Sequence, residues 1–308
     1  MKTRRTSEIE RLHCAAALAA FTLIEIMVVV VLLSLIILGL LAMFDQTEKA
    51  FKAGTAQTDQ LEAGRMFSDL LLRDMEQIEP TGQTNAINFW AEIPNYGTLQ
   101  PLQQFLPPGS VRTNLLQDLY FVSRMNQTIS GIGYFVRTNP SVNGNIDLVG
   151  TLYRFQTNFP IGVFNANPQA SFQSLFASTN GYSITNPGPV SKIMDGVVEF
   201  RVHCYDTNGY LLNGESGINY FTNFVNIQDW NIPGGGTTSN DVQLIIFSNS
   251  IVPAYVEVQL GVLEPAVLKR YNSIPNVIAR QNFLSNHAGN VQLFRQRIPI
   301  RNVDPSAY

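Results

Sequence analysis

The chain has 308 residues, of which 45% are apolar and 14% are charged, and its formal net charge is -3. A disordered chain would carry more charge and fewer aromatic residues than the 19 Phe and 11 Tyr found here, so the composition excludes disorder. The near-neutral charge argues against nucleic acid as a partner, and two cysteines are too few for a disulfide-framed small domain. The length predicts one or two domains.

The first 44 residues divide into a short basic leader and a long apolar run. Residues 1–20 carry four basic and two acidic side chains, and this net charge of +2 favours the cytoplasmic side of a membrane. Residues 21–44 contain one charge, and as a helix they would be about 36 Å long, enough to span a hydrocarbon core of about 30 Å. The run is longer than the apolar part of a cleaved secretory signal, so we expect a membrane-spanning helix.

The single charge in this run is Glu25. An unpaired carboxylate inside a membrane helix costs about 2.5–3.5 kcal/mol, so such a residue is a functional candidate that needs a partner. The alternative is that Glu25 lies at headgroup depth, where it would be ionised and solvated.

Residues 19–25, with the sequence AAFTLIE, resemble the processing site of type IV prepilins and pseudopilins. The resemblance implies that a membrane prepilin peptidase cleaves between Ala20 and Phe21 and that the new amine of Phe21 is methylated, giving N-methylphenylalanine. It also implies that this amine pairs with Glu25 of a neighbouring subunit, which removes the cost of a buried charge only in the assembled state. Ala20 stands where the family usually has Gly, and Ala42 stands where it often has Pro, which predicts a straighter helix.

Residues 45–80 are expected to continue the apolar helix as an amphipathic stalk. They are mostly good helix formers, and apolar residues recur at helical spacing at Phe67, Leu70, Leu71 and Ile78. Pro80, followed by Thr-Gly, supplies a stop signal, so we expect one helix from Phe21 to Glu79. Residues 62–77 resemble the second half of the long helix in J-type minor pseudopilins and W-type minor pilins.

Residues 81–308 are expected to form a β-rich head in mostly antiparallel sheets. The predicted fold class is therefore α+β, with the long N-terminal helix packed on this head. Short apolar runs between turn residues predict strands at 119–124, 133–137, 147–155, 196–205, 242–247, 252–262 and 291–300. The even-numbered residues of 198–204 are expected to share one face, and Asn208-Gly209 is typical of a tight turn. A helix is expected at 275–284, and long loops are expected within 119–137 and 165–189.

Several segments of the head occur in the order seen in J-type minor pseudopilins. They are IGYFVR at 132–137, LYRF at 152–155, IMDGVVEFRVHCYD at 193–206 and IVPAYVEVQLGVL at 251–263. The resemblance implies a strand pair, then a strand beginning at Asp-Gly-Val, then an edge strand introduced by proline. The residues after Leu263 and the Gly-rich insert at 231–240 have no counterpart in that family.

No pattern in the chain predicts catalysis or a cofactor. The three histidines form no spaced cluster, and the usual hydrolase, metalloprotease and phosphate-loop motifs are absent from the sequence. Once the leader is removed, Cys204 is the only cysteine, and we expect it to be a buried apolar side chain. Asp206 and Asn208, with Glu215 further on, resemble part of a calcium loop, and the alternative for them is a simple turn.

Taken together, these features predict a structural subunit and not an enzyme. The chain most resembles a minor pseudopilin of a type II secretion system, which implies a single-pass protein of the bacterial inner membrane with its head in the periplasm. The expected partners are the prepilin peptidase/methyltransferase, other pseudopilin or pilin subunits, and inner-membrane lipid. One alternative is a minor pilin of a surface or DNA-uptake pilus. Another is a membrane-anchored β-domain that binds a ligand without assembling.

Overall fold

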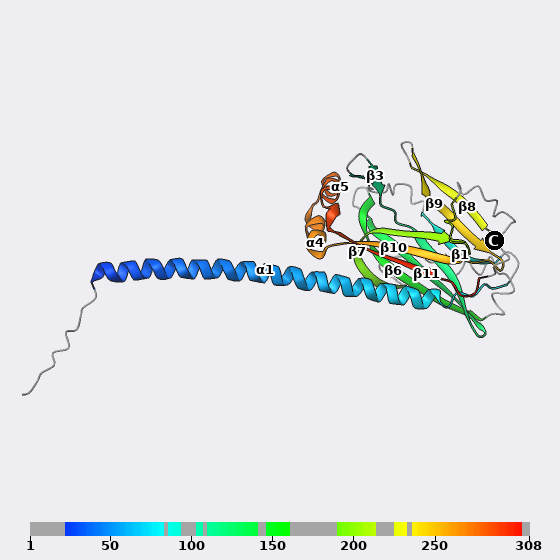
Figure 1. Cartoon of the computed structure of the whole chain (residues 1–308), viewed down its shortest axis with the longest axis horizontal. Coiled ribbons are helices and arrows are strands. Elements are labelled where there is room, and N and C mark those ends of the chain that lie inside the picture. The colour runs from blue at the N-terminus through cyan, green and yellow to red at the C-terminus, as the bar shows by residue number, and fades with distance from the viewer. Residues whose placement is uncertain are drawn as a thin grey trace, which may run out of the picture. The chain divides into compact units, whose positions relative to one another are not determined.

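The computed structural model describes residues 22–82, 86–93, 103–106, 110–140, 146–160, 190–213, 225–232 and 236–303 (Figure 1). The fold is α+β, as predicted. The helices are α1 (Leu23–Met75), α4 (Pro265–Ser273) and α5 (Val277–Asn286). The strands are β1 (Ile87–Glu92), β2 (Gln103–Leu106), β3 (Ser110–Thr113), β4 (Asp118–Met125), β5 (Thr128–Pro140), β6 (Ile146–Pro160), β7 (Val190–Tyr205), β8 (Val225–Ile232), β9 (Gly236–Ser248), β10 (Tyr255–Leu263) and β11 (Val291–Pro299).

The chain divides into two compact units, 1–54 and 55–308. The described part of the first unit is the beginning of α1, where apolar side chains point outward all around the helix. The second unit contains the rest of α1 and every strand. Because most of the apolar residues of the second unit are buried and those of 23–44 are not, the two units require different surroundings.

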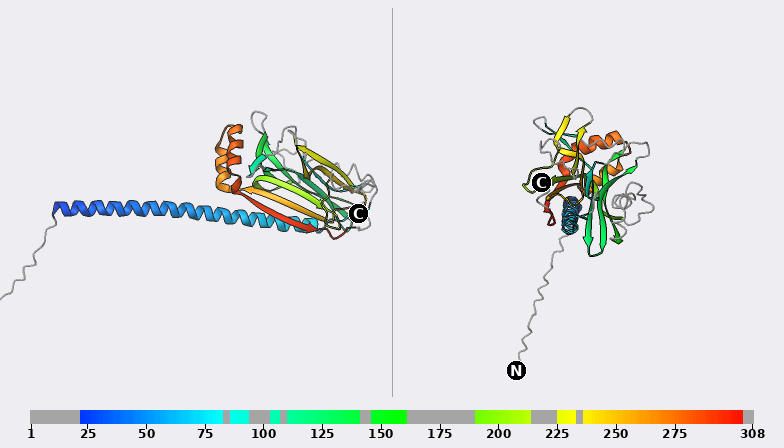
Figure 2. Two further views of the ribbon diagram at one scale, coloured as in Figure 1. Left: turned by 45° about the horizontal axis from the view of Figure 1, so that its top comes forward. Right: turned by 90° about the vertical axis from the view of Figure 1, so that its right-hand side faces the viewer.

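The head is built on one nine-stranded antiparallel sheet in the order β11-β10-β7-β6-β5-β4-β1-β9-β8, and β2 and β3 form a separate hairpin. Alternation of side chains along β4 supplies both faces of the sheet: Leu119 and Phe121 point to one side, and Tyr120 and Val122 point to the other. The second half of α1 lies against the first of these faces (Figure 2). The main core is therefore a helix-on-sheet layer.

Aromatic side chains fill this layer. Phe67 of α1 packs edge-on against Tyr134 of β5 and Phe200 of β7, with ring centroids 5.8 and 6.2 Å apart. Leu71 and Met75 of α1 are completely buried against the same sheet face. Burying a large apolar side chain contributes about 1.5–3 kcal/mol, so this helix face is a substantial part of the stability of the head.

The predicted strands and the helix at 275–284 correspond to elements of the structure, but the stalk helix ends earlier than predicted. It ends at Met75 and not at Glu79. Ile78 instead forms an isolated β-bridge with Ser123, and its carbonyl accepts a hydrogen bond from Asn302. The N–H groups of Gln77 and Ile78 donate to carbonyls three residues back, at Asp74 and Met75, so the α-helical pattern ends there and Ile78 joins the sheet before the proline.

Two further expectations about the head were wrong. Residues 119–137 contain no long loop, because β4 and β5 are joined by a tight turn in which Asn126 adopts a left-handed conformation (φ 56°). Val198 does not share a face with Phe200, because an irregularity in the β7–β10 pairing puts Val197 in the main core and Val198 against α4 and α5. The loop expected at 165–189 lies outside the described residues.

Candidate functional site

The first candidate site is the beginning of α1. Thr22 precedes the helix, and the Glu25 N–H donates to the Thr22 carbonyl at 3.0 Å and lies 3.4 Å from its hydroxyl. The Thr-x-x-Glu spacing is that of a helix capping box, and a carboxylate in the first turn complements the helix dipole. No cation of the described residues pairs with the exposed Glu25 carboxylate. Ala20 and Phe21, the predicted cleavage and methylation positions, lie outside the described residues.

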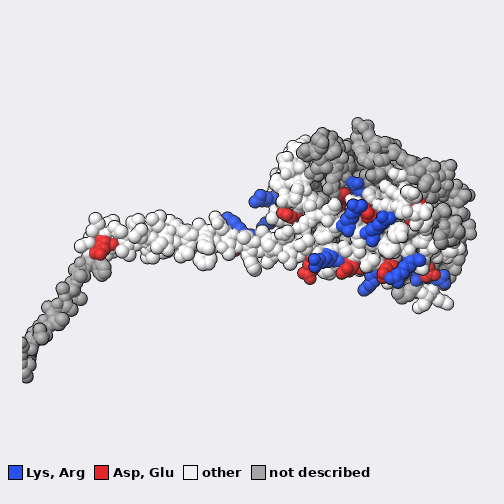
Figure 3. All heavy atoms as spheres, viewed as in Figure 1, with Lys and Arg blue, Asp and Glu red and all other residues white. Residues whose placement is uncertain are grey.

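The stretch that follows Glu25 is the one helix of the described chain that is long and apolar enough to cross a membrane. Its apolar side chains are exposed along the whole stretch, and none of its most apolar part is buried. Figure 3 shows the stretch almost entirely white, with acidic atoms only near its start. Such a helix serves as a membrane anchor or as a signal segment.

The second half of α1 docks on the sheet through one narrow face. Its buried residues recur at spacings of three and four, from Gln60 through Gly64 and Phe67 to Leu71 and Asp74. The helix approaches β11 so closely at Gly64 that only glycine fits there, because a Cβ at this position would lie 2.2 Å from the ring of Phe294. The apolar packing and the lack of a side chain at Gly64 together determine which face of the helix is buried.

A buried ion pair also fixes the rotation of the helix. Asp74 accepts two hydrogen bonds from the Arg154 guanidinium, at 2.6 and 3.0 Å, and one from the Tyr134 hydroxyl at 2.5 Å. Burial and the neighbouring Asp74 charge raise the pKa of the Tyr134 hydroxyl, so it remains a donor at any physiological pH. Arg154 and Tyr134 come from adjacent strands, so one carboxylate joins α1 to β5 and β6.

A shallow apolar groove runs beside the docked helix. Its volume is about 550 Å³, and its walls come from α1 and from the start of β7: Ala63, Met66, Phe67, Asp69, Leu70, Arg73 and Ile193. Asp69 and Arg73 form no ion pair with the described residues, so both signs of charge are available at the rim. Met66 is 67% exposed, which is a large fraction for an apolar side chain beside a groove.

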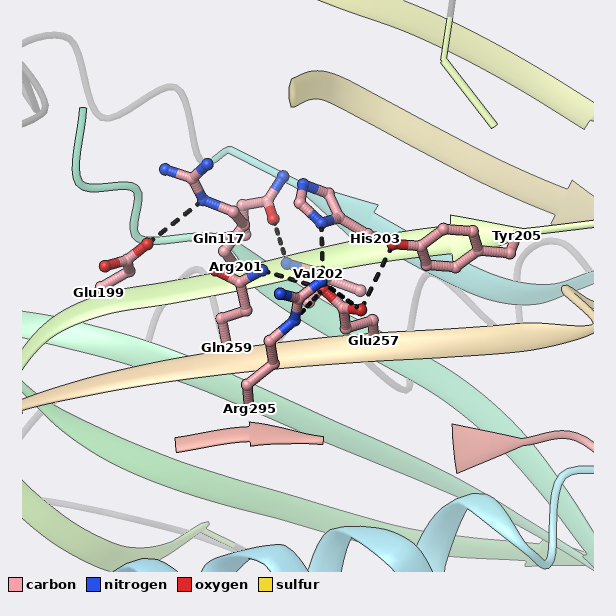
Figure 4. Close-up of polar contacts among 9 residues, drawn as sticks. All are labelled: Gln117, Glu199, Arg201, Val202, His203, Tyr205, Glu257, Gln259 and Arg295. Carbon is pink, nitrogen blue, oxygen red and sulfur yellow. Dashed lines mark hydrogen bonds and ion pairs between the residues drawn. The ribbon is translucent and has the colours of Figure 1, made fainter. Parts of the chain in front are cut away.

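The opposite face of the sheet carries a polar cluster across β7, β10 and β11 (Figure 4). Glu257 lies at its centre, and the Arg295 guanidinium donates to both of its carboxylate oxygens at 2.8 and 2.9 Å. Gln259 donates to the same carboxylate at 2.9 Å, and Tyr205 does so at 3.4 Å. Burial acts to raise the pKa of Glu257, but the hydrogen bonds from Arg295 and Gln259 hold it below its ordinary value.

The contacts of this cluster join neighbouring strands. Gln117 adds a further link, because its side-chain oxygen accepts the Val202 N–H at 2.6 Å while its own N–H donates to the Phe200 carbonyl at 2.8 Å. The Glu257 carboxylate is occupied by donors from its own strand and its neighbours. The cluster therefore stabilises this side of the sheet.

Asp206 and Asn208, the calcium candidates, lie in a turn closed by the protein's own backbone. The Asp206 carboxylate accepts the backbone N–H groups of Asn208 and Tyr210, at 2.9 and 2.7 Å. This is the geometry of the simple turn that was the alternative to a calcium loop. Glu215 lies outside the described residues. No group of three or more His, Cys, Asp or Glu side chains in the described ranges is placed to hold a metal ion.

Sequence reasoning missed the Asp74–Arg154–Tyr134 contact, and one signal could have revealed it. Asp74 is three residues after Leu71, which puts a carboxylate on the apolar face of the predicted helix. A charge at such a position requires a buried partner. The sequence does not show which of the head's basic residues supplies it.

Comparisons with protein-family models, with curated proteins and with solved structures found no match. The architecture established here is an apolar N-terminal helix followed by an antiparallel β-domain on which its second half packs.

Proposed function

We propose that the chain is a structural subunit of a type IV pilin-like filament, and specifically a minor pseudopilin of a type II secretion system. The observation that carries this proposal is the division of α1: its first half is apolar on every side, and its second half is held to the head by one face. A membrane anchor alone does not need the continuation of its helix to pack along the domain that it carries. A filament subunit does, because its head has to be held to the helix through which the subunit assembles.

Glu25 has a defined part in this proposal. Its carboxylate lies in the first turn of α1 without a cation partner among the described residues. Cleavage before Phe21 would create an ammonium group at the same depth, and pairing between subunits would offset the cost of both charges. The groove beside Ala63–Arg73 offers an apolar surface to a neighbouring subunit.

The mass of the N-terminal peptide, taken from protein purified out of its native membrane, tests the filament class. We expect a peptide that begins at Phe21 and carries one additional methyl group. An intact leader would contradict the proposal and favour a membrane-anchored β-domain that binds a ligand without assembling.

The variant Glu25→Ala tests the pairing step separately. We expect normal membrane insertion and cleavage but reduced incorporation into filaments, measured by the fraction of subunits in sheared or cross-linked assemblies. Glu48→Ala is the matched control, because it removes a carboxylate from the same helix outside the apolar run. Equal incorporation of both variants would disprove the pairing of Glu25.

Genes that neighbour this one would separate a secretion pseudopilus from a surface or DNA-uptake pilus. A secretin and an assembly ATPase of the secretion type are expected beside it.

A further inference from the structure

The hairpin of α4 and α5 lies at the end of the head where the stalk helix enters (Figures 1 and 2). The side-chain amide of Gln60, the first buried residue of α1, donates to the Val262 carbonyl at 3.0 Å. Val262 is three residues before α4 begins. At the other end of the head, Arg301 pairs with Glu76 at 2.9 Å, just beyond the end of α1. The hairpin is therefore at the end of the head that is closer along α1 to the apolar run.

The α4–α5 hairpin is positively charged. Residues 265–286 contain three Lys or Arg and no Asp or Glu, in a chain whose net charge is -3. Lys269 and Arg270 of α4 are exposed, and neither forms an ion pair with any part of the chain that the structure describes. Ile278, at the start of α5, is 67% exposed. The hairpin thus presents two cations and an apolar side chain, with no acidic residue on either helix.

The membrane is close along the chain. Gln60 follows Phe44 by sixteen residues, which is at most about 24 Å of helix. The two compact units meet at Gly54, ten residues after Phe44, and no atom lies within 4 Å of the position a Cβ would take there. Glycine inside a helix weakens it and allows it to bend. A bend at Gly54 would let the head lean toward the bilayer.

We propose that the α4–α5 hairpin binds the surface of the same membrane that holds α1. Lys269 and Arg270 contact anionic lipid headgroups, and Ile278 enters the interfacial layer. The helix dipole favours a cation in the last turn of α4, and this could by itself account for Arg270. It does not account for Lys269 or for the lack of acidic residues on the two helices. This contact holds the head before any assembly. It depends on α1 being a membrane anchor and not on the filament function.

The test uses the full chain in nanodiscs, with a fluorophore at Asn272→Cys on α4 and an energy-transfer acceptor on lipid headgroups. Cys14→Ser removes the leader cysteine. Cys204 stays unlabelled because it is buried, and its protection also reports that each variant is folded. Discs of phosphatidylcholine alone are compared with discs that also contain phosphatidylglycerol.

We expect more energy transfer in the anionic discs and a loss of the difference at high salt. Each cation near an anionic surface is worth about fivefold, so Lys269→Gln with Arg270→Gln should lower the ratio of membrane-bound to free heads by up to about 30-fold. The control is Arg124→Gln with Arg301→Gln, which removes the same charge at the other end of the head. Equal transfer in both lipids, or an equal effect of the two double variants, would overturn the proposal.

Discussion

The contact of Asp74 with Arg154 and Tyr134 gives the most direct test of how the stalk is held. Asp74→Asn keeps the shape of the side chain and removes its charge. The Arg154 side chain is only 17% exposed, so its guanidinium would lose its carboxylate partner in a place that water reaches poorly. The amide of Asn offers one acceptor oxygen where the carboxylate offers two.

The expected cost follows from this geometry. Removing one partner of a fully buried ion pair costs about 3–5 kcal/mol. Arg154 is partly solvated and keeps a hydrogen bond to Gln156 at 2.8 Å, so we expect a smaller loss of about 2–3 kcal/mol. In a unit of about 250 residues, each kcal/mol lowers the melting temperature by about 2–4 °C, which gives a fall of about 4–12 °C.

Thermal unfolding of the full chain in detergent micelles, followed by near-ultraviolet circular dichroism, measures this loss. Asp69→Asn is the control, because Asp69 is an exposed residue of the same helix and should change the stability by less than about 0.5 kcal/mol. A double-mutant cycle with Arg154→Gln should give a coupling energy above about 1 kcal/mol. Equal melting temperatures for Asp74→Asn and Asp69→Asn would refute the reasoning.

Three other predictions concern the head. Burial and the charge of Asp118, its partner across the β1–β4 pair, raise the pKa of Glu92 to about 7, so stability should fall as the pH rises from about 4.5 to 7. Because Glu92 is only half-buried, Glu92→Gln should raise the free energy of unfolding, measured with urea, by about 1–2 kcal/mol at about pH 8 and leave it unchanged at about pH 4. An equal increase at the two pH values would contradict the raised pKa of Glu92. Gly64→Ala should cost about 1–2 kcal/mol despite the better helix propensity of Ala, because its methyl group meets the Phe294 ring; Phe294→Leu should restore the loss, and a stabilised single variant would disprove the clash. Burial raises the pKa of the Cys204 thiol, which should react with N-ethylmaleimide only on unfolding, as mass spectrometry of the peptide that contains it would show; rapid labelling of that peptide in the folded chain would be inconsistent with this packing.

The elements that depend on local pattern were predictable from the sequence. The apolar run of α1 and the alternation in β7 and β10 identify a helix and two strands without any knowledge of their partners. Helix α4 was not predicted, although Pro265 at its start and Val267 and Tyr271, four residues apart on its buried face, are ordinary helix signals.

The contacts between distant residues were not predictable. Asp74 and Arg154 are separated by 80 residues, and several basic residues of the head could have served as the partner. The prediction that Val198 shares a face with Phe200 was wrong for a related reason. The irregularity that moves Val198 to the other face lies in the pairing of β7 with β10 and not in the sequence of β7. The Glu25 site was predicted from its cost in a membrane, whereas its hydrogen bond with Thr22 was missed, although the Thr-x-x-Glu spacing is a sequence signal for the start of a helix.

The last strand of the chain has a consequence for biogenesis. β11 pairs with β10 and supplies the Phe294 ring that fills the space left by Gly64 in α1. The membrane segment leaves the ribosome more than two hundred residues before this strand does. The face of α1 around Gly64 therefore stays uncovered until β11 has been made, although Phe67 can already pack on β5 and β7, and closure between such distant segments is slow. A chain truncated before Val291 would keep its apolar run and lose the contact at Gly64, so only a chain that includes β11 can complete the packing of the stalk.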